Sequence, residues 1–397
     1  MVFIWILWSL VWGGLFTGLY NLSSGMLASP FSFIQGIRSL FPIIAIYLCL
    51  MWIFLTKKKI HSFSTPLGLF FVYGLIGLVV SFLSPDKLTA MYWGGLFLSP
   101  IIVLWVVLSG EEVMPKFRAV LIINYIVAIS VVITLLPETF GIIQYNRVST
   151  FYSLPFGMGD ITKNGAGRFA LIVIIISMVR ILTGQEKKRY LWVFISVPSF
   201  YLLMQTQSRT ALLGLAVATV LIVLIRKMRW QFLLIGPVSA FVLWTSGYKW
   251  RAQQELAKIF ELTGRKLTWQ DAVSMIKQSP FLGWGFHADR LLLDSQHVHN
   301  SYLHALINSG ILGSIFFVGA IILFWYMVIR TKTFAHIDKA SLVEKPFLIE
   351  SLLILGALTA RSFFESTAAF YGVDLLFFLP AMTYVFYWMH QEYQGDE

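Results

Sequence analysis

Long apolar runs separated by short polar stretches recur along the whole chain. Each run is close to the roughly 20 residues that an α-helix needs to cross a bilayer. A segment in lipid must satisfy its own backbone amides, so these runs are expected to form helices. We place them near residues 2–20, 38–56, 66–84, 91–109, 119–136, 166–183, 190–207, 210–226, 230–247, 301–329, 347–366 and 369–390.

Composition also indicates a protein embedded in lipid. Of the 397 residues, 58% are hydrophobic and 12% are charged, about half the charged fraction of a soluble domain. We therefore expect an all-α, polytopic membrane protein of about 12 transmembrane helices, in which residues 1–397 form a single integral membrane domain. The first run lacks a basic leader and a clear cleavage site, which favours a membrane helix over a cleaved signal peptide.

Basic residues mark the expected orientation. They fall on one side if both termini are cytoplasmic, as the positive-inside rule requires. Much of the net charge of +11 has this explanation, so it does not indicate a nucleic-acid partner. The clusters are Lys57 to Lys59, Lys116 with Arg118, Lys187 to Arg189, Arg226 with Lys227 and Arg229, and Arg330 with Lys332, Lys339 and Lys345.

The other face holds a large extracytoplasmic loop at 248–300 and further cations that topology does not need. A solvated loop explains them simply, whereas an anionic ligand on that face is the sharper interpretation. Within this loop, Thr268 to Asp271 has capping-box-like spacing, and apolar residues then repeat at helical intervals up to Pro280. We expect a short amphipathic helix lying on the membrane or over a cavity.

Two arginines on this face are candidate ligands of a diphosphate. Arg209 lies in TQSRTALLGL at a boundary between two predicted helices, and Arg265 lies in the loop stretch LTGRKLTWQDA. A guanidinium at the hydrocarbon boundary is costly unless it meets water or an anion. It also grips phosphate through a planar fork that lysine lacks. Snorkelling to lipid phosphates is the alternative for Arg209.

Histidines cluster where the helix predicted at 301–329 begins. His287, His297, His299 and His304 lie within a short stretch, and histidine is the natural general base near neutral pH. A metal site is disfavoured, because His299 and His304 do not share a helical face and no carboxylate lies at HExxH-like spacing. The single cysteine, Cys49, lies in an apolar run and excludes sites built on several cysteines.

Four motifs in order resemble those of the O-antigen ligase and Wzy-type polysaccharide polymerase superfamily. HNSYLHALINSGILG fits its pattern of His-Asn followed by two spaced glycines, and TGRKLTWQDA with SPFLGWGF is similar to its loop signature. SRTALLGL and KNGAG resemble two further family motifs. The resemblance covers roughly residues 160–320 directly and implies a GT-C-like membrane fold.

The resemblance implies a glycosyltransferase that needs neither a metal nor another cofactor. The donor would be an undecaprenyl-diphosphate-linked oligosaccharide on the outer face of a bacterial cytoplasmic membrane. The acceptor would be a glycan or a lipid core, and membrane lipids and a chain-length regulator are further expected partners. His299 would be the catalytic base, and Arg209 and Arg265 would bind the diphosphate. Asn300, Asn164 and Arg168 would support the site.

Other readings stay open at this stage. Polymerase and ligase differ in their acceptor, and the motifs do not separate them, although the compact loop slightly favours the polymerase. A lipid-linked sugar flippase or another transporter of about 12 helices is the alternative from a different class. Transporters usually carry ionisable residues near the middle of the membrane. Arg361 and Glu365, near the end of a predicted helix, are expected to pair with each other or to line the cleft.

Overall fold

A computed structural model describes most of the chain. The described residues are 1–15, 37–56, 65–109, 111–140, 151–153, 160–183, 186–225, 265–293 and 297–394. The helix predicted at 230–247 and the part of the large loop at 248–264 lie outside them.

The described chain is almost entirely helical. A single two-stranded antiparallel sheet interrupts the helices, formed by β1 (Phe151–Ser153) and β2 (Asp160–Thr162). The principal helices are α1 (Val2–Gly13), α3 (Phe41–Thr56), α4 (Pro66–Val80), α5 (Lys87–Leu108), α6 (Val113–Thr139), α7 (Lys163–Thr183), α8 (Glu186–Thr206), α9 (Arg209–Ile225), α11 (Arg265–Gln278), α12 (Ala288–Leu292), α13 (Ser301–Arg330), α14 (Thr333–His336), α15 (Glu344–Arg361) and α16 (Val373–Gln394). The all-α class predicted from the apolar runs is confirmed.

Several helices are suited to crossing a bilayer. Five stretches are long and apolar enough, namely Pro66–Leu83 and the helices α5, α6, α7 and α13. The helices α1, α3 and α9 are shorter but also apolar. A chain with this many apolar helices is a polytopic membrane protein, because lipid can cover apolar side chains that water would not.

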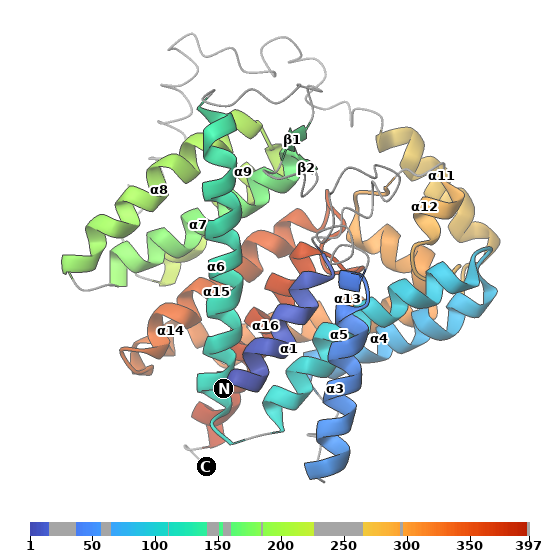
Figure 1. The fold of residues 1–397 in the computed structure, drawn as a ribbon, viewed down its shortest axis with the longest axis horizontal. Helices are drawn as coiled ribbons and strands as arrows, with labels where there is room; N and C mark the ends of the chain where they lie inside the picture. Colours follow the sequence, from blue (N-terminus) through green and yellow to red (C-terminus); the bar gives the residue numbers. More distant parts are fainter. Residues whose placement is uncertain are drawn as a thin grey trace.

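One continuous apolar core joins the helices. Buried residues from α1, α3 to α9, α13, α15 and α16 belong to the same hydrophobic cluster. Helix α7 packs against α8, α4 against α13, and α15 against α9. The chain ends lie near each other at one end of the molecule, whereas β1, β2, α11 and α12 lie toward the opposite side (Figure 1).

A second, smaller apolar cluster forms over the start of α13. Its members are Ala272, Met275, Ala288, Leu293, Val298 and Ile307. They come from α11, α12 and the segment that enters α13, so the described part of the large loop packs on this helix. The loop helix α11 begins at Arg265 rather than at Thr268, and Thr268 is an interior, buried residue. The capping-box-like spacing therefore gave the wrong start for this helix.

Helix α13 is broken at Gly310, and the loop 279–286 docks into the break. Gly310 has a φ of 58° and a ψ of −165°, which is not helical. The freed backbone groups are taken up by the loop: Trp284 N–H donates to the Ile307 carbonyl at 2.7 Å, and Ile311 N–H donates to the Pro280 carbonyl at 2.8 Å. A Cβ atom on Gly283 would lie 2.5 Å from the Gly310 nitrogen. Both positions need glycine, for its tolerance of positive φ and for the close backbone approach.

Candidate active site

His299 lies two residues before the first residue of α13, and its ring faces a carboxylate. Its Nδ1 atom is 2.9 Å from Oε2 of Glu365, which lies just beyond the end of α15. The backbone of His299 has a φ of 50°, an uncommon conformation that tends to persist where the surroundings fix it. The imidazole is 36% exposed, whereas the Glu365 side chain is 11% exposed. The ring is therefore held through Nδ1, while the side chain as a whole stays partly exposed.

Arg265 approaches the same carboxylate from the large loop. Its Nη2 atom is 3.1 Å from Oε1 of Glu365, and its Nη1–H donates to the Phe364 carbonyl at 2.6 Å. Asn164, in the first turn of α7, donates to the same Oε1 at 3.2 Å. Glu365 thus joins three residues singled out from the sequence: His299, Arg265 and Asn164.

The surroundings keep Glu365 ionised. Burial opposes its charge, but the hydrogen bond from His299 and the positive charges of Arg361 and Arg265 lower its pKa to about 2. An ionised carboxylate only accepts hydrogen bonds, so Nδ1 of His299 carries the proton and donates it. The other ring nitrogen, Nε2, is not part of this contact.

The KNGAG and SRT motifs meet where the start of α9 packs against α7 and α15. Ser208 and Thr206 pack so closely on α7 that a Cβ on Gly167 would lie 2.8 Å from the Ser208 Cβ. Thr210 accepts a hydrogen bond at 3.3 Å from Nη1 of Arg361. Gly167 of the KNGAG motif packs against Ser208 of the SRT motif, and Thr210 of that motif bonds to Arg361. These contacts join α7, α9 and α15.

The structure places Arg209 at this junction. The residue is exposed, and its guanidinium forms no ion pair or hydrogen bond with the described part of the chain. Arg265 is tied to His299 only through Glu365. Arg265 and His299 therefore share the Glu365 carboxylate, whereas no contact joins Arg209 to His299 within the described residues, and a shared diphosphate site for the two arginines stays a prediction.

The remaining supporting residues have structural partners. Asn300 is the N-cap of α13, where its side-chain oxygen accepts from the Tyr302 and Leu303 amides and its amide donates to the Phe363 carbonyl. Arg168 forms an ion pair with Asp374, with Nη1 at 3.3 Å from Oδ1. Their contacts in this structure therefore hold α7, α13 and the 362–374 segment in place.

The expected pairing of Arg361 with Glu365 is not found. Within the described residues, no ion pair joins the two side chains, although Arg361 lies close enough for its charge to influence Glu365. Arg361 is 2% exposed and donates to Thr210 instead. The reason is geometric, because the Glu365 oxygens are already taken by His299, Arg265 and Asn164. The other expectation, that Glu365 lines the site, fits its contacts.

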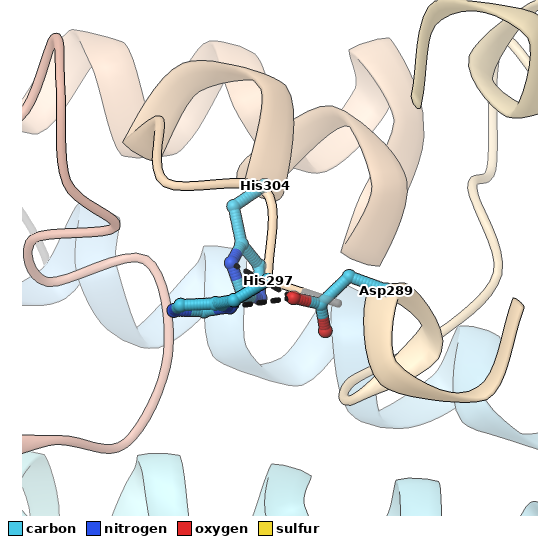
Figure 2. Close-up of side chains that lie close together, drawn as sticks. All are labelled: Asp289, His297 and His304. Carbon is cyan, nitrogen blue, oxygen red and sulfur yellow. Dashed lines mark hydrogen bonds and ion pairs between the residues drawn. The ribbon is translucent and has the colours of Figure 1, made fainter. Parts of the chain in front are cut away.

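A second polar cluster lies beside this site, on the other side of the α13 start. Asp289, His297 and His304 present side-chain atoms that all lie within 4.8 Å of one another, a grouping able to hold a metal ion. Figure 2 shows that they come from α12, from the segment before α13 and from α13 itself, with both rings turned toward the carboxylate. His297 Nδ1–H donates to Oδ2 of Asp289 at 2.7 Å.

Asp289 carries its negative charge inside the protein. It is 1% exposed, and burial opposes its ionisation, but neighbouring His304 and the hydrogen bond from His297 lower its pKa below the usual range. A buried carboxylate is stable only with such partners. The cluster therefore consists of a buried carboxylate with two imidazoles as its neighbours.

Sequence reasoning did not single out Asp289 or Asp374, and it gave Glu365 no place among the site residues. A signal was present for Asp374, because a lone acid inside the apolar run YGVDLLFF is expensive in a membrane and so points to a partner. The partners of Asp289 and Glu365 could not be deduced, since they lie in other helices.

Comparison with known proteins supports the family resemblance. Residues 194–318 match the family described as O-Antigen ligase, so this part of the chain carries a domain of that family. The chain is also similar to the Exopolysaccharide production protein ExoQ of Rhizobium meliloti (strain 1021), with 22% identity over 343 residues, which cover 78% of this chain and 74% of that protein. The family match over residues 194–318 includes Arg209, Arg265 and His299, and it ends inside α13.

Proposed function

We propose that this membrane protein, with its O-antigen ligase family domain, is a glycosyltransferase that acts on lipid-linked glycans. It moves a glycan from an undecaprenyl-diphosphate carrier to an acceptor sugar hydroxyl on the outer face of the cytoplasmic membrane. Both polymerase and ligase chemistry fit this description. Similarity to an exopolysaccharide production protein, together with the compact loop, favours a polymerase whose acceptor is another lipid-linked glycan.

The observation that carries the proposal is the hydrogen bond between His299 and Glu365. It fixes the ring and assigns the proton to Nδ1, and it leaves Nε2 as the base on the half-exposed side. A histidine positioned in this way by a carboxylate can take a proton and is stabilised once it carries the charge.

The proposed reaction uses these residues in the following way. The acceptor hydroxyl gives its proton to Nε2 of His299 as its oxygen attacks the anomeric carbon of the donor. The bond between that carbon and the diphosphate oxygen breaks, and the leaving group departs as undecaprenyl diphosphate. The proton on His299 then passes to solvent or to the departing phosphate. No metal is needed in these steps.

The arginines have different parts in this scheme. Arg209 is exposed at the start of α9, so its fork is available to the donor diphosphate. Arg265 shares its guanidinium between Glu365 and the Phe364 carbonyl, which leaves some of its five N–H groups for phosphate. Positive charge placed where the leaving group becomes more negative lowers the barrier.

The test is transfer by the purified full-length protein with a synthetic undecaprenyl-diphosphate glycan. His299→Ala is expected to abolish polymer formation, because it removes the base, while the protein remains inserted and monodisperse. His336→Ala is a control, since that histidine lies in α14, away from the site. Polymer formation by His299→Ala at a rate comparable with that of the unmodified protein would refute the assignment of the base.

A further inference from the structure

His304 is a buried histidine whose polar atoms are left without partners. It is 1% exposed, and neither ring nitrogen has a hydrogen-bond partner among the described residues. Buried polar groups are rarely left in this state unless a water or an ion completes them. The ring cannot easily turn away, because it stacks on Phe370 with a centroid distance of 5.1 Å and an angle of 4° between the planes.

The ring nitrogens face a ready set of ligands. His304 Nδ1 is 3.7 Å from Oδ2 of Asp289, too far for a hydrogen bond. Two ligands of one tetrahedral zinc ion, each about 2.0 to 2.2 Å from the metal, stand about 3.3 Å apart. The spacing is therefore closer to that of two metal ligands than to that of a bonded pair. The third ligand, His297, has its Nδ1 atom at 2.7 Å from the same oxygen; to bind the ion it would lose the Nδ1 proton to solvent and move outward by about half an ångström.

We propose that Asp289, His297 and His304 form a binding site for one divalent transition-metal ion, zinc being the best match. Two imidazoles and one carboxylate are a common ligand set for zinc. A hard ion such as Mg²⁺ or Ca²⁺ prefers a site rich in oxygen. Arg290 also lies near the cluster and acts on its charge, which disfavours ions that depend on several carboxylates.

The space around the cluster suits the fourth ligand of such an ion. A cavity of about 20 Å³ is lined by these three side chains together with Trp93, His287 and Arg290. This is room for roughly one water molecule. A site of three protein ligands and one water is a regular zinc arrangement.

The position of the ligands indicates what the metal would do. His299 lies between two of them in sequence, and its ring centroid is 5.0 Å from that of His297. An ion held by Asp289 in α12, by His297 and by His304 in α13 would fix the segment that presents His299. It would act by positioning, and the transfer chemistry proposed above does not pass through it.

Metal content tests the proposal directly. The full-length protein, freed of any polyhistidine tag, is treated with chelator in detergent, incubated with Zn²⁺ and desalted, and its zinc is measured by mass spectrometry. One equivalent is expected for the unmodified protein and for the control His287→Gln, which changes the same cavity but not the ligands. Asp289→Asn and His297→Gln should each lower the retained zinc at least tenfold.

Two further measurements distinguish specific binding at this site from misfolding of a variant and from binding of zinc at the protein surface. Co²⁺ added to the unmodified protein should give the visible absorption of a low-symmetry site with nitrogen and oxygen ligands. Zn²⁺ should raise the melting temperature of the unmodified protein by several degrees but leave that of Asp289→Asn unchanged. If the unmodified protein retains no zinc, or if Asp289→Asn and His297→Gln both retain a full equivalent, the proposal is overturned, whatever the transfer activity.

Discussion

Replacing Glu365 with glutamine is the sharpest test of how His299 is positioned. The change keeps the size of the side chain and removes its charge. In the unmodified protein, the carboxylate accepts a hydrogen bond from Nδ1 of His299 at 2.9 Å and pairs with Arg265 at 3.1 Å. Glutamine can retain weaker versions of these contacts, but it cannot stabilise a positive charge on the ring. The variant therefore separates charge from shape.

The magnitude follows from the electrostatics of the site. The surroundings lower the pKa of Glu365 from 4.5 to about 2, which corresponds to roughly 3 kcal/mol in favour of the ionised form. Losing the charge should cost the transition state, in which His299 becomes positive, an energy of the same order. A barrier raised by about 3 kcal/mol slows the reaction by about 10²-fold. We expect kcat to fall by roughly 10 to 10² and KM to change little.

The assay is steady-state transfer by the purified protein, with melting temperature recorded in parallel. Glu111→Gln is the matched control, because Glu111 is exposed and outside the site. Glu365→Asp should recover part of the lost rate, since it restores the charge at a greater distance. A kcat for Glu365→Gln within threefold of the control would refute the reasoning. A large rise in KM with unchanged kcat would do the same, since it would point to substrate binding.

Three other perturbations give distinct outcomes. Arg209→Lys should lower kcat/KM at least about tenfold by losing the guanidinium fork, whereas Arg330→Lys, at the far end of α13, should have no effect. Gly310→Ala should destabilise the protein by more than about 2 kcal/mol, because its φ is positive and its Cβ would overlap the docked loop. Gly319→Ala in the same helix meets nothing and should be neutral in thermal unfolding. The stability that Glu365 supplies should be complete above about pH 4.5 and should be lost toward pH 2, so the melting temperature should fall over that window less steeply for Glu365→Gln.

Much of the fold could be predicted because lipid imposes a simple rule on sequence. The helix predicted at 301–329 is observed as Ser301–Arg330, and that at 38–56 as Phe41–Thr56. Boundaries were less certain where charged residues begin a helix. The helix predicted from 119 begins at Val113, because Met114 and Phe117 are buried in the core, while the neighbouring basic residues Lys116 and Arg118 need not be. Charge alone was therefore a poor marker of where this helix starts.

The site was predictable in kind but not in its connections. His299, Arg265 and Asn164 carry residue types suited to proton and phosphate chemistry, so they could be chosen from the chain alone. Their common partner, Glu365, follows His299 by 66 positions, and no local pattern encodes that pairing. Asp289 and His304 are likewise joined only by the packing of α12 on α13. Contacts of this kind depend on how helices pack, which periodicity does not report.

The break in α13 has a practical consequence for anyone who recombines this protein with a relative. Residues 279–286 and the residues around Gly310 are joined by backbone hydrogen bonds in both directions. A chimera with a crossover between them would combine the docking loop of one parent with the broken part of α13 from the other. Exchanging residues 279–313 as one cassette would keep these contacts within one parent, with one junction just after α11 and the other inside α13.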